Sequence, residues 1–265
     1  MAKIIFFQAH PDDLELSCCH LMHYLAKKSK KNHVIRVASM TKGEFGLPGA
    51  EYDKFKGDFL AKVRTRELYK AQAIHGIPPE NIDFFGYIDG FVKFNREFIK
   101  RITDYINKEK PDIIIAPEPI YTWYFHKDHI NTGKAIFYII YNKLIDYEKT
   151  PILYYYSSLS SNYYFGFRKK EIALTKKLIS KHKTQAWLMN TLMMSYIPLT
   201  RLAGMKLKRW KYAEAYRRIY FKNPRKHKPS LLSQMISHFC YSHIQWYSAK
   251  YPQAILEDLK RKGEI

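Results

Sequence analysis

The sequence has few cysteines, and their positions exclude two common uses of this residue. Only three occur in 265 residues, Cys18, Cys19 and Cys240. The neighbouring pair cannot easily bridge to each other, and none of the three has the spacing of a zinc finger. We therefore expect reduced cysteines that serve in packing.

Long apolar runs are also absent. No run of about 18 or more apolar residues is present that could form a transmembrane helix. The apolar stretch at residues 4–7 is too short for a signal peptide. Residues 187–205 are apolar but interrupted by Asn190, Pro198 and Arg201, and could form a packed helix, a lid or a surface that touches lipid. We expect a cytoplasmic protein, with peripheral contact at the inner face of a membrane as an alternative.

Acidic residues are scarce relative to basic ones. The chain has 24 Asp and Glu against 45 Lys and Arg, which gives a formal net charge of +21 and favours anionic partners. Eleven basic residues and one acidic residue, Glu214, lie in residues 201–228, interleaved with aromatic residues. Nucleic acid, acidic lipid and a phosphorylated sugar all fit this bias. No nucleic-acid recognition motif is present, so a nucleic-acid-binding protein is the less favoured alternative.

Short apolar runs alternate with helical patterns over the first two thirds of the chain, which predicts an α/β fold with a mostly parallel sheet and helices on both faces. Gly76 and Pro111 fit the ends of two of the helical patterns. The predicted strands are residues 4–9, 33–40, 82–87, 112–116 and 152–157. The predicted helices are residues 14–27, 53–75, 95–109, 129–145 and 169–187. After about residue 188 the alternation fades.

Polar clusters follow the strands, where ligands bind in open parallel sheets. His10, Asp12 and Asp13 come directly after the first predicted strand. A divalent cation would compensate these groups, although Asp12 and Asp13 could equally cap the following helix.

A second polar cluster, His126, Asp128 and His129, follows the fourth predicted strand. Because both clusters lie at the same edge of the sheet, they can face each other. A His and an Asp from one loop with a His from the other would make three metal ligands and leave a position open for water, as catalytic zinc requires.

The ordered set of motifs over about residues 3–216 resembles the LmbE-like superfamily, which includes the N-acetylglucosaminyl-phosphatidylinositol de-N-acetylases. The matching motifs are His10-Pro11-Asp12-Asp13-x-Glu15, Thr41-x-Gly43-Glu44-x-Gly46, Arg64-x-x-Glu67, Asp89-Gly90, His126-x-Asp128-His129, His182-Lys183-Thr184-Gln185 and the weaker Glu214-Ala215-Tyr216. Lys127 stands where the family commonly has proline, which affects no expected ligand.

The resemblance implies a Rossmann-like fold and a role for each residue of the two clusters. Zinc would be held by His10, Asp13 and His129, and Asp12 would be the general base that takes a proton from water. His126 would stabilise or protonate the tetrahedral intermediate, and Asp128 would orient an imidazole. This ligand set would also accept iron, cobalt or nickel.

The resemblance further implies that Glu44, Arg64 and Asp89 face the sugar hydroxyls. A surface ion pair between Arg64 and Glu67, three residues apart on a helix, is the competing interpretation. Tyr124 could lean over the reacting carbonyl or could serve in packing.

The predicted function is zinc-dependent N-deacetylation of an N-acetylated amino sugar, with a phosphorylated or lipid-linked sugar as a candidate substrate. A related zinc amidase acting on another amide is the alternative enzyme. We expect a deacetylase domain at residues 1–220 and a basic helical extension at residues 221–265 packed on it.

Overall fold

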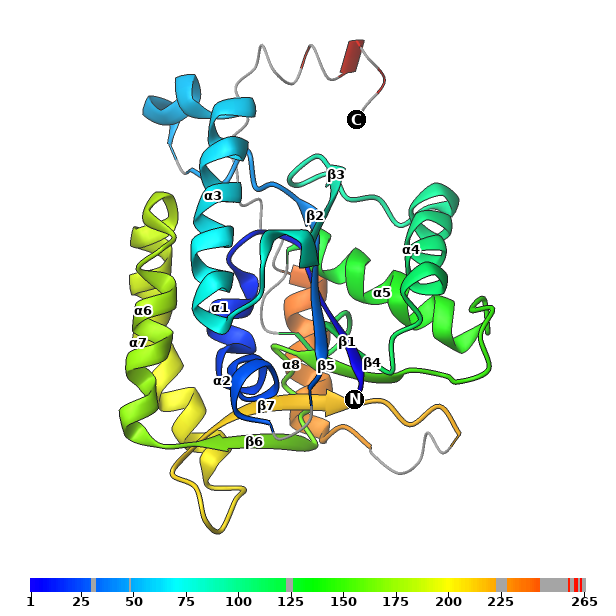
Figure 1. Cartoon of the computed structure of the whole chain (residues 1–265), viewed down its shortest axis with the longest axis vertical. Coiled ribbons are helices and arrows are strands. Elements are labelled where there is room, and N and C mark those ends of the chain that lie inside the picture. The colour runs from blue at the N-terminus through cyan, green and yellow to red at the C-terminus, as the bar shows by residue number, and fades with distance from the viewer. Residues whose placement is uncertain are drawn as a thin grey trace.

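The computed structural model describes residues 1–29, 32–47, 49–122, 126–222 and 228–243, together with residues 257, 260, 261 and 263. In these residues seven strands form one sheet in the order β3-β2-β1-β4-β5-β7-β6 (Figure 1). They are β1 Lys3–Gln8, β2 Val34–Thr41, β3 Ile82–Tyr87, β4 Ile113–Pro117, β5 Ile152–Tyr156, β6 Tyr163–Phe167 and β7 Tyr212–Arg218. Strands β1 to β5 are parallel, whereas β7 is antiparallel to both β5 and β6.

Helices cover both faces of the sheet, which confirms the predicted fold class. The helices are α1 Asp13–Ser17, α2 Cys19–His23, α3 Asp58–His75, α4 Arg96–Glu109, α5 Lys127–Tyr141, α6 Ile172–Ile179, α7 Ala186–Gly204 and α8 Leu231–His243. Figure 1 shows α4 and α5 on one side of the sheet and α1, α2, α3 and α6 on the other.

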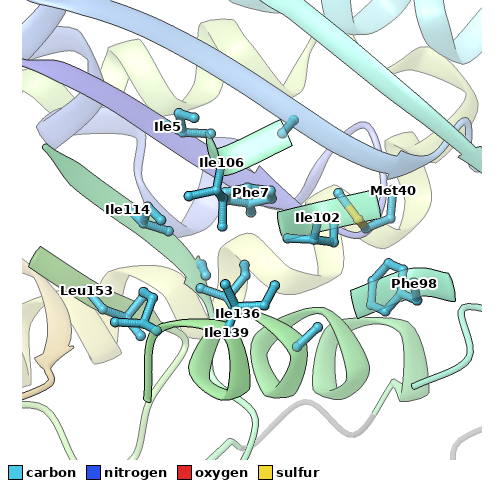
Figure 2. Packing of buried hydrophobic residues seen from close by; sticks show 14 of the residues in the cluster. Ile5, Phe7, Met40, Phe98, Ile102, Ile106, Ile114, Ile136, Ile139 and Leu153 are labelled. Atoms are coloured by element: carbon cyan, nitrogen blue, oxygen red, sulfur yellow. The ribbon is translucent and has the colours of Figure 1, made fainter. Parts of the chain in front are cut away.

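The two faces of β1 bury alternate residues, as a strand between two helical layers requires. Ile5 and Phe7 pack with α4 and α5, through residues such as Ile102 and Ile136 (Figure 2). Ile4 and Phe6 belong to a second core with residues of α1, α2 and α3. Burial on both faces explains why β1 is a continuous apolar run in the sequence.

The helix ends follow local sequence signals. Asn95 caps α4, because its side-chain oxygen accepts a hydrogen bond from the Phe98 N–H at 2.8 Å. Gly76 ends α3 in the left-handed conformation, with φ at 80°, as its position in the sequence predicts.

Several predicted boundaries are wrong. The helical pattern at residues 14–27 is divided into α1, α2 and a π-helical turn at Tyr24–Lys28. The pattern at residues 169–187 contains a short 3₁₀ turn, α6, a second 3₁₀ turn and the start of α7. The antiparallel pair β6 and β7 is not among the predicted strands, because aromatic and basic residues there obscure the alternation of buried and exposed positions.

The region after β7 is partly described. Helix α8 packs on the rest of the chain through two serines: Ser233 Oγ donates to the Leu159 carbonyl at 3.0 Å, and Ser237 Oγ donates to the Ile120 carbonyl at 2.6 Å. The division at residues 220 and 221 remains a prediction. Among the described residues, no helix has the combined length and apolar character needed to cross a bilayer.

Candidate active site

The two polar loops meet where the strand order reverses, between β1 and β4. In a parallel sheet this switch point leaves a crevice at the carboxyl ends of the strands. A cavity of about 650 Å³ lies there, lined by seven of the predicted site residues. They are His10, Asp12, Asp13, Arg64, Asp89, His126 and His129.

Three of these side chains form a compact triangle of ligand atoms. His10 Nδ1 lies 3.1 Å from His129 Nε2 and 3.7 Å from Asp13 Oδ1, and His129 Nε2 lies 3.2 Å from Asp13 Oδ1. Ligands about 2.0–2.1 Å from a tetrahedral zinc ion are about 3.3–3.4 Å apart, so this spacing suits such an ion. The donor set of two imidazoles and one carboxylate is also one that zinc accepts.

The rest of Asp13 is held by the backbone. Its Oδ2 accepts hydrogen bonds from the N–H groups of Ala9, at 2.8 Å, and His10, at 2.9 Å, while Oδ1 faces the triangle. Burial alone would raise the pKa of Asp13, but His129 and His10 lower it well below its ordinary value. Asp13 therefore serves as a fixed carboxylate with one oxygen aimed at the two imidazoles.

His10 is oriented through its other ring nitrogen. Nε2 lies 3.0 Å from Asp89 Oδ1 and 3.2 Å from Asp128 Oδ2. Burial alone would lower the pKa of His10, but the charge of Asp89 and hydrogen bonds to Asp128, Asp13 and Asp89 raise it well above its ordinary value. The two carboxylates hold a proton on Nε2, so a metal ion that displaced the proton of Nδ1 would bind the electron pair of that atom, which is how carboxylates orient metal-binding imidazoles.

Asp128 is fully buried and ties this arrangement to a neighbouring loop. Its Oδ2 accepts a hydrogen bond from the Gly90 N–H at 2.7 Å, and its Oδ1 accepts one from the Val92 N–H at 3.1 Å. These bonds hold the loop that carries Asp89. The contacts of Asp128 are those of a residue that positions His10 from outside the cavity.

Neither aspartate of the first loop caps α1 with its side chain. Asp12 Oδ1 lies 2.9 Å from Arg64 NH2 instead, and Asp12 lines the cavity beside the triangle. The helix-capping interpretation of Asp12 and Asp13 is therefore wrong for this structure. Asp12 is left as a carboxylate at the cavity wall, next to the proposed metal position.

Arg64 comes from α3 and is 2% exposed, so it is not half of a surface ion pair with Glu67. Its guanidinium also donates from NH1 to the Gly43 carbonyl at 2.8 Å. Glu67 instead accepts hydrogen bonds from the backbone N–H of Thr184, at 3.0 Å, and from its hydroxyl, at 2.6 Å. The interpretation of Arg64 and Glu67 as a surface ion pair is wrong.

The glycines of the Thr41-x-Gly43-Glu44-x-Gly46 motif make room for Arg64. A Cβ atom on Gly46 would lie 2.2 Å from Arg64 NH1, and one on Gly43 would lie 2.1 Å from the same atom. Gly43 also has φ at 67°, which glycine adopts at low cost. The motif therefore allows the backbone to approach the guanidinium that holds Asp12.

His126 caps α5 with its ring. Its Nδ1 accepts a hydrogen bond from the Asp128 N–H at 3.2 Å, so in the neutral ring the proton is on Nε2. Burial and the neighbouring His10 lower the pKa of His126 to about 4, and its ring centroid lies 4.5 Å from that of His10. A neutral ring with a proton on Nε2 can donate a hydrogen bond at neutral pH.

Glu44 and Tyr124 are the last two of the predicted substrate-binding residues. Glu44 Oε1 accepts a hydrogen bond from the Asp89 N–H at 2.9 Å, and Glu44 is not among the residues that line the cavity. Burial and the charge of Asp89 raise the pKa of Glu44 to about 7. Tyr124 lies outside the described residues. Sugar binding by Glu44, Arg64, Asp89 and Tyr124 remains a prediction.

A further part of the cavity was not predicted. One wall is apolar and comes from α7, with Leu188, Leu192, Leu199 and Leu202. A run of serines in the segment after β5, residues 157–161, which includes Leu159, also lines the cavity. In the sequence, residues 187–205 are an interrupted apolar stretch that could form a packed helix, a lid or a surface that touches lipid. The cavity that this stretch lines depends on tertiary packing and is not visible in the sequence.

Glu214 lies at the edge of the cavity and supports α2. Its carboxylate accepts hydrogen bonds from the N–H groups of His20, at 2.7 Å, and Leu21, at 2.9 Å, and from the Tyr216 hydroxyl at 2.8 Å. Burial raises the pKa of Glu214 to about 7. These contacts give the Glu214-Ala215-Tyr216 motif a structural role at the first turn of α2.

Comparison with known proteins places this site in context. The chain is 28% identical over 131 residues to the diacetylchitobiose deacetylase of Thermococcus kodakarensis, covering 49% of this chain and 46% of the relative, so it spans about half the length of that curated protein.

Solved structures share the fold. The N,N'-diacetylchitobiose deacetylase of Pyrococcus horikoshii aligns with a TM-score of 0.73 and 21% identity over 87% of each chain. GalB, a 4-carboxy-2-hydroxymuconate hydratase of Pseudomonas putida, aligns with a TM-score of 0.64 and 14% identity, over 83% of this chain and 97% of GalB. Because one of these neighbours is a hydratase, the fold alone does not determine the reaction.

The family model described as PIG-L, GlcNAc-PI de-N-acetylase, matches residues 5–140. This range includes both polar loops and all of the residues that form the triangle. The chain therefore belongs to the PIG-L family of GlcNAc-PI de-N-acetylases.

Proposed function

We propose that this chain is a zinc-dependent hydrolase that removes the acetyl group from the nitrogen of an N-acetylglucosamine-type sugar conjugate. The observation that carries the proposal is the triangle of His10 Nδ1, Asp13 Oδ1 and His129 Nε2, with the Asp12 carboxylate beside it in the same cavity. Membership of the family and the deacetylases among its relatives support this reaction.

His10, Asp13 and His129 would hold the zinc ion. Bound zinc supplies Lewis-acid chemistry, which polarises a carbonyl and brings the pKa of a water molecule down to about 7. Asp89 and Asp128 keep His10 in the tautomer that leaves Nδ1 free to donate its electron pair.

Asp12 would act as the base. The guanidinium of Arg64 holds Asp12 Oδ1 at 2.9 Å, which fixes the carboxylate against the cavity wall. Asp12 can take the proton of the attacking water and pass it to the nitrogen of the departing amine as the amide bond breaks.

His126 would stabilise the acetyl oxygen as that oxygen gains negative charge. In the neutral ring Nε2 carries the proton, because Nδ1 accepts the hydrogen bond from the Asp128 N–H. A donor already fixed in the cavity does not have to reorient during the reaction, which is the basis of this kind of stabilisation.

The group attached to the acetylated sugar is the part of the substrate that the catalytic residues do not specify. Lys206 and Lys228 also line the cavity, which supports a conjugate with an anionic group, phosphorylated or lipid-linked. We retain the cytoplasm as the expected location.

The test is a mass-spectrometric screen of N-acetylated sugars, including N-acetylglucosamine and diacetylchitobiose, with chelator-treated protein and with zinc added back. We expect acetate release that disappears with the chelator and returns with zinc. Full activity in metal-free protein would overturn the mechanism. Cleavage of other amides without any acetylated sugar as a substrate would favour the related amidase.

A further inference from the structure

Residues 182–185, at the junction of α6 and α7, have no part in the mechanism proposed above, yet they are anchored to the elements that form the site. His182 Nε2 lies 3.2 Å from Glu15 Oε1, and both side chains are fully buried. The same Glu15 oxygen accepts a hydrogen bond from Gln72 Nε2 at 3.2 Å. Glu15 belongs to α1, the helix that begins at Asp13. One end of the segment is therefore fixed to the loop that carries the proposed metal ligand.

The second anchor of the segment is on α3. Glu67 accepts hydrogen bonds from the Thr184 N–H at 3.0 Å and from the Thr184 hydroxyl at 2.6 Å. The same helix carries Arg64, about one turn before Glu67. Between the two anchors the Gln185 N–H donates to the His182 carbonyl at 3.0 Å, which closes a tight turn. These contacts fix the position of Gln185 relative to Arg64.

The side chain of Gln185 lines the active-site cavity beside the Arg64 guanidinium. A Cβ atom on Gly46 would lie 2.2 Å from Arg64 NH1 and 3.2 Å from Gln185 Nε2, so both groups end next to the same glycine. The other terminal nitrogen of Arg64 is the one that lies 2.9 Å from Asp12 Oδ1. Arg64 therefore reaches the proposed base with one nitrogen and the neighbourhood of Gln185 with the other.

The amide of Gln185 has unused capacity for hydrogen bonds. A carboxamide has two N–H donors and an oxygen that can accept two bonds. Within the part of the chain that the structure describes, this side chain makes one hydrogen bond, from Nε2 to the Thr184 carbonyl at 3.3 Å. It does not cap α7, although Gln185 is the N-cap residue of that helix. Gln185 is only 4% exposed, and a buried polar group without partners is costly, so the arrangement points to a ligand that pairs with the amide.

The chemistry of the substrate indicates which part of it would pair with this amide, a step that rests on the proposed function. On one side of the reacting amide bond the acetyl group ends in a methyl group, which forms no hydrogen bond. On the other side is the sugar, whose hydroxyl groups both donate and accept, as a carboxamide does. Leu188 and Met189, which follow Gln185 in α7 and also line the cavity, have no group that could bind a hydroxyl.

We propose that Gln185 hydrogen-bonds a hydroxyl group of the acetylated sugar and so selects between sugars that differ at that carbon. In the competing interpretation, the amide only supports Arg64. Such support would act through Asp12 and would affect all substrates alike. A contact with a hydroxyl group affects only the sugars that carry that group.

The test uses the zinc-loaded protein with the methyl glycoside of N-acetylglucosamine and with its 3-deoxy, 4-deoxy and 6-deoxy counterparts. Gln185→Met keeps the length of the side chain and removes its hydrogen bonds. We expect kcat/KM for the parent sugar to fall by about tenfold, mainly through KM, as for loss of a hydrogen bond that is made in both the ground state and the transition state. With one of the deoxy sugars the variant and the unchanged protein should have the same kcat/KM, because the hydroxyl group is already missing.

The matched control is Asn190→Leu, which removes an exposed amide of the same helix that does not line the cavity. We expect unchanged kinetics with every sugar. Gln185→Asn is a second variant of the proposed residue: it keeps an amide and withdraws it by one methylene group. It should show the same pattern as Gln185→Met, and it provides the test if Gln185→Met does not fold. Circular dichroism and zinc content identify the variants that are folded and loaded.

Two kinetic results would overturn the proposal. One is an equal loss with the parent sugar and all three deoxy sugars, which would assign Gln185 to the support of Arg64. The other is unchanged kinetics with the parent sugar in both Gln185 variants.

If the unchanged protein releases acetate from none of these sugars, the proposed function fails, and calorimetric titration of the same sugars tests Gln185 separately. The unchanged protein should bind the parent sugar more tightly than one of the deoxy sugars, and the Gln185 variants should lose this difference. Equal affinities for all four sugars in the unchanged protein, or a difference that both Gln185 variants keep, would overturn the proposal.

Discussion

At the scale of single residues, His10 connects the two halves of the site. Its Nδ1 faces His129 and Asp13, and its Nε2 faces Asp89 and Asp128. The ring therefore joins the loop after β1 to the loop after β3 and to the first turn of α5. Because each nitrogen has a different set of partners, a change on the Nε2 side can alter the basicity and orientation of the Nδ1 side.

Asp12 and Asp13 are adjacent in sequence but have separate partners, so their variants should behave differently. Asp12→Asn keeps an oxygen for Arg64 and should retain zinc while turnover falls by on the order of a hundredfold or more, as expected for loss of a general base. Asp13→Ala removes a proposed ligand and should lose zinc. Metal analysis and turnover on the same preparations check both outcomes.

The test is the comparison of zinc content between the Asp12 and Asp13 variants. If both keep zinc, or both lose it, the assignment of one aspartate to the metal and the other to the proton is wrong. Glu67→Gln offers a control on α3, because Glu67 binds Thr184 outside the triangle.

At the scale of elements, the sequence predicts the parallel part of the sheet well. Strands β1 to β5 are buried between helices, so each is a short apolar run with a helical pattern after it. Strands β6 and β7 are antiparallel to each other. The rule that a strand, a helix and a second strand form parallel neighbours therefore does not identify this pair. β7 also contains Glu214 and Arg217, whose side chains bind partners far away in sequence.

The sequence predicts only those parts of the candidate site whose residues lie close together in the sequence. His10 to Asp13 and His126 to His129 are dense clusters at strand ends, which made the triangle an expectation. The contacts of Arg64 with Asp12 and of Asp89 with His10 join segments that are distant in sequence. No spacing rule identifies such pairs, so the family resemblance implies a sugar-binding role for Asp89 but the sequence does not predict its contact with His10.

An ion pair between the half-buried Arg217 and the buried Glu118 ties β7 to the end of β4. Arg217 donates to the Glu118 carboxylate from Nε at 2.7 Å and from NH2 at 2.6 Å. Arg217→Ala should lower the free energy of unfolding by about 3–5 kcal/mol, because it leaves the buried Glu118 uncompensated. Urea denaturation checks this value.

The double variant Glu118→Gln/Arg217→Met separates charge from packing. The amide oxygen of the introduced glutamine would still accept the hydrogen bonds that Ile120 and Tyr121 donate to Glu118. Stability should therefore be recovered in part. A double variant less stable than Arg217→Ala would show that the pair matters for reasons other than the uncompensated charge.

At the scale of the whole molecule, acid should destabilise the fold through buried neutral histidines. Burial lowers the pKa of His75 to about 3, against an ordinary value of 6.5. Its contribution to stability is therefore complete above pH 6.5 and is lost as the pH falls toward 3, with a slope of up to about 1.4 kcal/mol per pH unit. The variant His75→Gln should lack this contribution.

The measurement is the difference in unfolding free energy between the unchanged protein and His75→Gln, from urea curves at several pH values between about 7.5 and about 4.5, a window that spans the titration of an unfolded histidine. The difference should move in favour of the variant as the pH falls. A difference independent of pH would show that His75 does not titrate as its burial requires. Taking the difference removes the opposing pH dependence of Glu214, whose pKa is raised to about 7.

The net charge of +21 is a property of the whole molecule that is compatible with several classes of anionic partner. Part of the basic stretch at residues 201–228 is structural, because Arg217 is bound to Glu118. Lys208, Arg209 and Lys211 are exposed in the segment after α7. A variant at these three positions can therefore distinguish an anionic or membrane-borne sugar from a nucleic acid as the partner.

Replacing Lys208, Arg209 and Lys211 with Gln should weaken use of an anionic or membrane-borne acetylated sugar and barely change hydrolysis of a small neutral one, because these residues lie outside the cavity wall. The loss should shrink as salt rises, since the screening length falls to about 8 Å at physiological ionic strength. A nucleic-acid-binding protein would instead lose tight, salt-sensitive binding to DNA or RNA and would never release acetate. Acetate release and nucleic-acid affinity, measured on this variant across one salt series, distinguish the two, because only an enzyme can keep full turnover of the neutral sugar while losing the charged one.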